Sequence, residues 1–283
     1  TLEKFQEAFE YVVGENLDKF FNWFHEAGTP KLIISESYTG KNYKVTFRQE
    51  KPMRPGKYSN KVMPITYKIL SGKGRFLQPK TTLVFDRKST SIELKNQSEK
   101  PAISLLNSFS APVTVEFKQS IDDLFSILEF ETDFTSVWIA KKNIDFIVLK
   151  KIASKQSDVE NVVSRTYKIL INKLDRPSLL AKLLELPSEN EYFFKLLETE
   201  QPDPKTIQQN LLKQRTLYKN YFREFSISYF ENFIHQKLYL RSNSDYQERA
   251  LACALIFLNK DTSFLDDFLN IIFNDSDNMS LKI

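Results

Sequence analysis

The first thirty residues carry apolar positions at the spacing of an α-helix, in two short stretches. The apolar residues of these stretches are Phe5, Ala8, Phe9, Val12 and Val13, then Leu17, Phe20, Phe21 and Phe24. Gly14 is expected to end the first helix, because glycine adopts the left-handed conformation of helix ends without strain. The second helix is expected to stop at the Gly-Thr-Pro of residues 28–30. Two helices this short do not make a domain, so residues 1–28 are predicted to be the tail helices of an upstream domain.

From Lys31 the apolar pattern changes to a period of two, which is typical of β-strands with one buried face. Tyr43, Val45 and Phe47 alternate with polar residues. Further runs of this kind are separated by proline and glycine turns, and they lie at 65–70, 81–85, 91–94, 103–106 and 113–117. About seven short strands in this space predict a small antiparallel β-sandwich over residues 29–119.

From Ser120 onward the pattern is helical again. Helix starts are marked by two capping-box pairs and by a proline suited to a first helical turn: Ser120 with Asp123, Ser188 with Glu191, and Pro177. Later helical stretches are expected at 205–240, 246–258 and 264–273. No fixed-period repeat is visible, so residues 120–283 are predicted to form an all-α bundle or α-solenoid. The expected fold class is therefore α+β and multidomain, with a small antiparallel β-sandwich followed by helices.

The composition narrows the function classes. The net charge of +4 comes from 40 basic and 36 acidic residues, and the two signs are interspersed. This is a weak footprint for nucleic acid or an anionic membrane, and neither is expected as a partner. No apolar run is long enough to span a bilayer, and no signal peptide is visible after Thr1. The lone cysteine, Cys253, lies in an apolar run, which indicates a structural thiol in a reducing compartment.

Residues that could support catalysis are few. His25 and Glu26 resemble the start of the zinc motif HExxH, in which two histidines one helical turn apart bind the metal. The position of the second histidine is Thr29, so the motif is broken. The other histidine, His235, has no ligand partner at helical spacing. We therefore expect no catalytic, cofactor-binding or metal-ligating residue in this chain.

Other chemical candidates have simpler structural interpretations. Acidic pairs at 122–123 and 266–267 fall in first helical turns, where the helix dipole accounts for them. Basic and aromatic residues interleave at 213–225, and an amphipathic helix with its aromatic residues inward is preferred to a single-stranded nucleic-acid site. The run at 274–278 lacks the glycine and glutamate of a calcium loop, and indicates a turn. Residues 73–75 lack the phosphate-loop pattern and predict a hairpin turn.

Five short motifs follow one another in an order known from one enzyme family. They are Phe-Asn-Trp-Phe-His-Glu-Ala-Gly-Thr-Pro at 21–30, Phe-Ser-Ala-Pro-Val at 109–113, Asp-Phe-Thr-Ser-Val-Trp at 133–138, and weaker matches at 184–191 and 278–279. In this order and over nearly the whole chain, they resemble the bacterial-type aminopeptidase N family, which are gluzincin zinc metalloaminopeptidases.

The resemblance implies a fragment with the family's β-sandwich and the first part of its C-terminal helical domain. The family's zinc motif and catalytic residues would lie upstream, so no site residue is carried onto this chain, which should be inactive and bind no cofactor. The parent enzyme would use zinc to remove N-terminal residues from peptides in the bacterial cytoplasm, as part of peptide catabolism. Its implied partners are the missing catalytic domain of the same polypeptide and peptide substrates.

Two other interpretations remain open. The chain could be a stand-alone helical module that binds a peptide or a partner protein and has no enzymatic activity. A third and weaker interpretation is a nucleic-acid binder that uses its basic helices. An HExxH motif upstream in the same reading frame would decide for the aminopeptidase interpretation.

Overall fold

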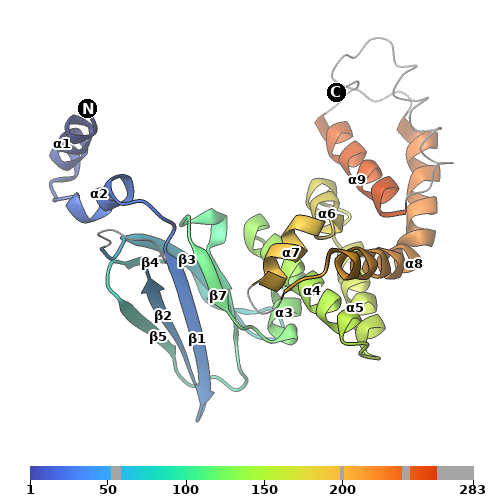
Figure 1. Ribbon diagram of the computed structural model, residues 1–283, viewed down its shortest axis with the longest axis horizontal. Coiled ribbons are helices and arrows are strands. Elements are labelled where there is room, and N and C mark those ends of the chain that lie inside the picture. Colours follow the sequence, from blue (N-terminus) through green and yellow to red (C-terminus); the bar gives the residue numbers. More distant parts are fainter. Residues whose placement is uncertain (52–58, 198–200, 238–242, 260–283) are drawn as a thin grey trace. The chain divides into compact units, whose positions relative to one another are not determined.

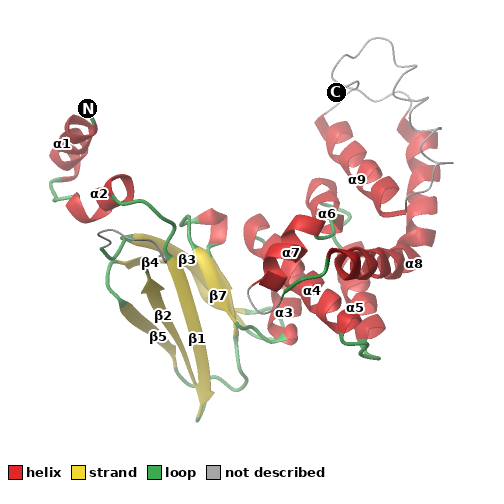
Figure 2. Ribbon diagram, viewed as in Figure 1, coloured by secondary structure: helices red, strands yellow, loops and turns green. Residues whose placement is uncertain are grey.

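The structure is a computed structural model that describes residues 1–51, 59–197, 201–237 and 243–259, with side chains described through 229, at 247 and over 250–259. The chain divides into two compact units, Thr1–Ala140 and Lys141–Ile283. The first unit contains all the described strands and the second is helical (Figures 1 and 2).

Two helices open the first unit, where the apolar spacing predicts them. The helix α1 covers Leu2–Val13 and ends at Gly14, whose φ of 74° is left-handed as expected. The helix α2 covers Asp18–His25 and ends before the predicted stop at 28–30. None of the residues of α1 is buried.

Seven strands follow among the described residues of the first unit, and they form two sheets. The strands are β1 (Lys31–Thr39), β2 (Asn42–Glu50), β3 (Met63–Leu70), β4 (Phe76–Phe85), β5 (Ser89–Leu94), β6 (Ala102–Leu105) and β7 (Thr114–Phe117). One sheet has the order β5-β2-β1-β7 and the other β4-β3-β6. Alternating residues of each sheet point into the space between them, and Tyr43, Val45 and Phe47 of β2 are buried there. The predicted β-sandwich is confirmed.

One strand pair differs from the antiparallel expectation. The strand β1 pairs with β2 antiparallel, but it pairs with β7 in parallel, with Lys31 opposite Thr114 and Ile34 opposite Phe117. The two strands come from the two ends of the sandwich sequence. Such a pair needs a long connection, which the five intervening strands provide, so the local spacing that predicts hairpins carries no signal for it.

The first helices after the sandwich begin as their capping signals predict. The helix α3 covers Ile121–Phe130, and Ser120 and Asp123 form a reciprocal capping box at its start. Asp123 also accepts an ion-pair hydrogen bond from Lys100 at 2.6 Å. The helix α4, Phe134–Ala153, runs from the first unit into the second.

The second unit continues with helices that pack in succession. They are α5 (Val159–Ile171), α6 (Pro177–Leu184), α7 (Glu189–Leu197), α8 (Pro204–Lys237) and α9 (Asn243–Asn259). The helix α8 contacts α5, α7 and α9, and α6 contacts α9. The predicted capping box of Ser188 with Glu191 forms before α7, and Pro177 begins α6. The predicted helical part of the fold is confirmed, whereas the stretch expected at 264–273 lies outside the described residues.

A polar cluster lies in the core of this helical unit. Lys141 and Asp145 are one helical turn apart on α4, are fully buried, and are joined by hydrogen bonds of 2.6 and 2.8 Å. The hydroxyl of Tyr218 donates to Asp145 Oδ1 at 2.8 Å, and Gln214 Nε2 donates to the Asp145 carbonyl oxygen at 3.0 Å. Burial lowers the pKa of Lys141 and raises that of Asp145. The cluster therefore joins α8 to α4 through directional bonds as well as apolar packing.

None of the helices in the described ranges is both long enough and apolar enough to cross a membrane.

Candidate functional site: a polar junction beside the sandwich

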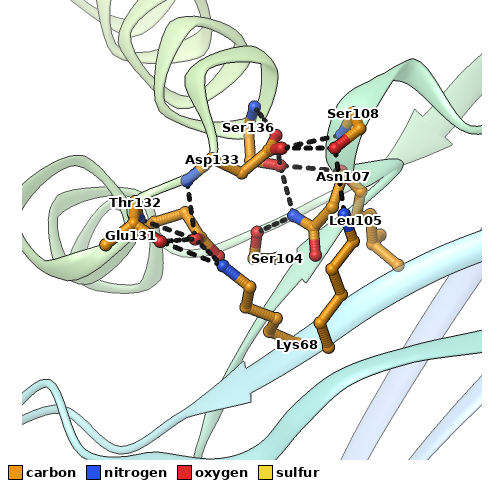
Figure 3. A network of polar contacts seen from close by, with 10 residues as sticks. Lys68, Ser104, Leu105, Asn107, Ser108, Glu131, Thr132, Asp133 and Ser136 are labelled. Carbon is orange, nitrogen blue, oxygen red and sulfur yellow. Dashed lines mark hydrogen bonds and ion pairs between the residues drawn. The ribbon is translucent and has the colours of Figure 1, made fainter.

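Polar side chains join the last strands of the sandwich to the first turn of α4 (Figure 3). Asp133 accepts hydrogen bonds at Oδ1 from the backbone N–H and the hydroxyl of Ser136, both at 3.0 Å, and so caps α4. At Oδ2 it accepts from the backbone N–H of Ser108 at 2.8 Å and from its hydroxyl at 3.0 Å. Burial raises the pKa of Asp133, but these hydrogen bonds outweigh it and the pKa is lowered overall.

The turn that carries Ser108 has an uncommon backbone. Leu106, Ser108 and Phe109 have φ of 52°, 56° and 53°, in the left-handed region that L-residues other than glycine adopt at a cost of about 1–2 kcal/mol each. Buried Asn107 lies within the turn and donates to the hydroxyls of Ser104 at 2.8 Å and Ser136 at 2.6 Å. A strained conformation persists only where its surroundings fix it, and here the hydrogen bonds of the junction do so.

A buried ion pair completes the junction. Lys68 on β3 donates to Glu131 Oε1, which also accepts from the backbone N–H of Thr132 at 2.6 Å and of Asp133 at 2.9 Å. Burial raises the pKa of Glu131, but the Lys68 ammonium and the backbone hydrogen bonds outweigh it, so the pKa is lowered. The motifs at 109–113 and 133–138 therefore adjoin one polar network. This network holds the start of α4 against β3 and against the turn that follows β6.

A second buried ion pair clamps α2 to the sandwich. The Nζ of Lys61 is fully buried and donates to Glu26 Oε2 at 2.8 Å and to the Asn22 carbonyl oxygen at 2.5 Å. Ser59 donates to the other side of the same carboxylate, at 2.8 Å from its N–H and 2.6 Å from its hydroxyl. Trp23 Nε1 donates to the Val62 carbonyl oxygen at 2.8 Å. The bonds from Lys61 and Ser59 lower the pKa of Glu26 to about 2.

The surroundings of His25 do not fit a zinc site. His25 is exposed and is the last residue of α2, so Thr29 lies beyond the helix rather than one turn along the same face. The Glu26 carboxylate is held by Lys61 and, with a pKa of about 2, is a poor base. Within the described residues, no group of three or more His, Cys, Asp or Glu side chains is placed so that it could hold a metal ion.

The remaining sequence candidates have structural roles of their own. Burial raises the pKa of the half-buried Cys253 thiol, as suits a structural residue. The backbone N–H of Ser71 donates to Arg75 O at 2.8 Å, so the segment around Lys73 is the predicted hairpin turn. Tyr218 and Phe222 are buried on α8, as the amphipathic interpretation of 213–225 expects. The side chain of His235, the pair at 266–267 and the run at 274–278 lie outside the described residues.

The helices α1 and α2 expose aromatic side chains, which we call the α1–α2 apolar face. Phe5 is 53% exposed, Phe9 49% and Phe24 58%. The rings form one array, with centroids 4.7 Å apart for Phe5 and Phe9 and 5.4 Å apart for Phe21 and Phe24. A cleft of about 700 Å³ lies beside it, lined by residues 23–29 and Pro112. Contiguous exposed apolar surface of this kind is typical of an interaction site.

Comparisons with known proteins assign the chain to a family. Residues 28–118 match the model described as a domain of unknown function with an Ig-like fold, DUF3458. Residues 121–283 match the model described as a domain of unknown function with ARM repeats, DUF3458_C. The chain belongs to the DUF3458_C family. The DUF3458 match covers the sandwich and the DUF3458_C match covers the helices that follow.

Relatives of this DUF3458_C chain carry the name aminopeptidase N. It is 24% identical to aminopeptidase N of Escherichia coli K12, and the match covers 99% of this chain and 34% of that protein. It is 28% identical to aminopeptidase N of Caulobacter vibrioides, and the match covers 67% of this chain and 23% of that protein. It is 26% identical to aminopeptidase N of Haemophilus influenzae, and the match covers 72% of this chain and 25% of that protein. The resemblance to the aminopeptidase N family is confirmed. The chain spans about a third or less of the length of these relatives.

A solved structure shares the fold of the DUF3458_C chain. Legionella pneumophila aminopeptidase A, solved in complex with aspartic acid, superimposes with a TM-score of 0.81 at 22% identity, over 99% of this chain and 34% of that one. At this identity the likeness describes the fold alone.

Proposed function

We propose that this chain is the non-catalytic part of a zinc-dependent aminopeptidase N, and that it supports and caps a catalytic domain of the same polypeptide. The whole enzyme would remove N-terminal amino acids from peptides in the cytoplasm, and the catalytic domain would hold the zinc. The motifs and the relatives named aminopeptidase N support the family part of this proposal. The observation that carries the supporting role is the α1–α2 apolar face.

The α2 part of that face, which carries Phe24, is anchored to the sandwich. The helix α2 cannot tilt freely, because Lys61 and Ser59 hold Glu26 and the Val62 carbonyl accepts from Trp23. Burial of Phe5, Phe9 and Phe24 against a partner domain would stabilise the assembly by about 0.8–1.5 kcal/mol per ring, since each is roughly half exposed and a fully buried ring contributes about 1.5–3 kcal/mol. A preorganised surface also loses less entropy on docking.

The enzymatic part is tested by comparing the isolated chain with the polypeptide encoded by the complete reading frame. We expect the isolated chain to bind no stoichiometric zinc and to hydrolyse no aminoacyl anilide, and the complete polypeptide to do both. Metal analysis after mild chelation and a chromogenic turnover assay measure these. Robust turnover or one tightly held zinc in the isolated chain contradicts the proposal. A complete polypeptide that lacks both contradicts it as well.

The supporting part is tested by the substitution Phe9→Asp in the complete polypeptide. A buried aspartate at the proposed interface is expected to lower the melting temperature of the catalytic domain and its turnover. The matched control is Phe194→Asp on α7, because Phe194 is a similarly exposed ring at 66% and lies in the other unit. Equal effects of the two substitutions, or none from Phe9→Asp, would argue against docking on this face.

The stand-alone interaction module remains the second candidate, because the same exposed rings suit an external partner. If this candidate is right, the complete reading frame contains no HExxH motif. The α1–α2 apolar face then stays free until that partner binds. Phe9→Asp would then leave all stability measurements unchanged and abolish only the binding of that partner.

A further inference from the structure

A cleft on the helical unit lies between the end of α4, the start of α5 and the middle of α8. Its volume is about 500 Å³, which suffices for more than one apolar side chain. The floor is formed by Ile152, which is buried, and by the half-buried Val159 and Leu217. Leu212 forms one wall and remains 63% exposed. The cleft is therefore an apolar groove between helices, open at its rim.

The rim of this cleft is basic. Lys151, Lys155 and Lys213 line it, and among the described residues that line it there is no carboxylate. Lys151 is occupied, because it donates to Gln156 at 2.9 Å and to Asp158 at 2.7 Å. Lys155, just beyond the end of α4, and Lys213 on α8 are exposed, and no ion pair satisfies either one within the described part of the chain.

The sequence of the two long helices extends this positive charge. Residues 204–223 of α8 contain five basic residues and no acidic one. Residues 146–157, at the end of α4 and just beyond, contain three lysines and no acidic residue. Of these basic residues, Lys213 lines the cleft, whereas Arg215 lines a separate cleft beside α6 and α9. The charge that attracts an acidic partner to this surface is therefore that of the rim lysines.

We infer that this cleft is a docking site for an acidic peptide segment of a partner protein, with an aliphatic or aromatic side chain on Ile152 and Leu212 and carboxylates on Lys155 and Lys213. The occupant is a peptide because the groove lies between helices and has an apolar floor, the form in which amphipathic segments bind. A single strand of nucleic acid fits less well, because Tyr218 and Phe222 of α8 are buried and cannot stack on bases. This inference goes beyond the proposed function and does not depend on it.

The test uses the whole chain and a fluorescein-labelled synthetic dodecapeptide that alternates acidic with leucine and phenylalanine residues. Fluorescence anisotropy is expected to show saturable binding that weakens as salt is raised. The same peptide with lysine at each acidic position should not bind. Zero-length carbodiimide crosslinking followed by mass spectrometry should attach the acidic peptide to Lys155 and Lys213.

Three substitutions assign the binding to the cleft. Lys213→Glu is expected to weaken it about tenfold, since it replaces an attraction with a repulsion at the rim. Leu212→Asp should weaken it through the apolar wall. Lys168→Glu is the matched control, because Lys168 is an exposed lysine near the far end of α5, and it should change affinity less than about twofold. Both cleft positions are exposed, and unchanged circular dichroism verifies that each variant is folded.

Several results would overturn the inference. One is the absence of acidic-peptide binding at millimolar concentration, and another is equal binding of the lysine peptide. Equal losses from Lys213→Glu and Lys168→Glu would show that general charge attracts the peptide and the cleft does not. A labelled oligothymidine that binds more tightly and loses affinity with the same substitutions would make the partner a nucleic acid.

Discussion

Gly74 offers the sharpest test of how the sandwich and α3 fit together. It lies in the turn between β3 and β4 with φ of 81°, and a Cβ built on it would lie 2.5 Å from two ring carbons of Phe130 at the end of α3. A Cβ at position 74 would overlap these ring atoms unless the ring or the backbone moved. Gly74→Ala therefore combines left-handed backbone strain of about 1–2 kcal/mol with an overpacking cost of about 1–3 kcal/mol. We expect a total loss of about 2–5 kcal/mol.

A control separates the two contributions. Gly40, in the turn between β1 and β2, has φ of 56° but no heavy atom within 4 Å of a built Cβ. Gly40→Ala should therefore cost only the strain, about 1 kcal/mol. In a Phe130→Ala background the additional cost of Gly74→Ala should largely disappear, which a double-mutant cycle measures as coupling energy.

The assay is urea unfolding followed by tryptophan fluorescence. The chain has two tryptophans, Trp23 and Trp138, and both lie in the first unit, so the signal reports the unit that contains Gly74. A Gly74→Ala variant no less stable than Gly40→Ala would refute the reasoning. So would a penalty that persists unchanged in the Phe130→Ala background.

Three further predictions concern the buried charges. Lys61→Met should cost about 1–3 kcal/mol, because it removes one charged partner of the Glu26 carboxylate, which keeps its bonds from Ser59. Lys182→Met at an exposed pair should cost under about 1 kcal/mol, as thermal unfolding would show. The folded-state pKa of Glu26, about 2, lies below its ordinary value of 4.5. The contribution of Glu26 to stability is therefore present above pH 4.5 and is lost as the pH falls toward 2. Glu26→Gln should flatten that part of the stability–pH curve. Asp145→Asn should cost about 3–5 kcal/mol because Lys141 stays buried without its counter-charge, and a smaller loss by calorimetry would contradict the pairing.

The regular elements could be predicted because their signals are local. Period-two alternation gave β2 with its buried face, and the capping pairs at 120–123 and 188–191 gave two helix starts. The strand β4 begins at Phe76, five residues before the predicted run at 81–85. The apolar alternation is lost in residues 76–80 because none of these side chains is buried, and Pro79 also interrupts the pattern.

The two polar clusters could not be predicted from the same signals. Lysine is expected at the surface, so no pattern indicates that Lys61 is fully buried. Glu26 attracted attention as part of a broken zinc motif, but its role follows from Ser59 and Lys61, more than thirty residues away. Asn107 lies two residues before the motif at 109–113, and only the three-dimensional structure brings its side chain to Ser136.

The parallel pairing of β1 with β7 also constrains how the sandwich folds. Lys31 and Thr114 are roughly eighty residues apart, and closing a loop of that length must precede any gain from the pair. The β1–β2 hairpin needs only the two-residue turn at Gly40 and Lys41. We therefore expect the hairpin to form early from its local contacts and β7 to join later. Until β7 joins, β1 has an open edge that can pair with another chain, so the docking of this last strand is expected to limit the exposure of the sheet to aggregation.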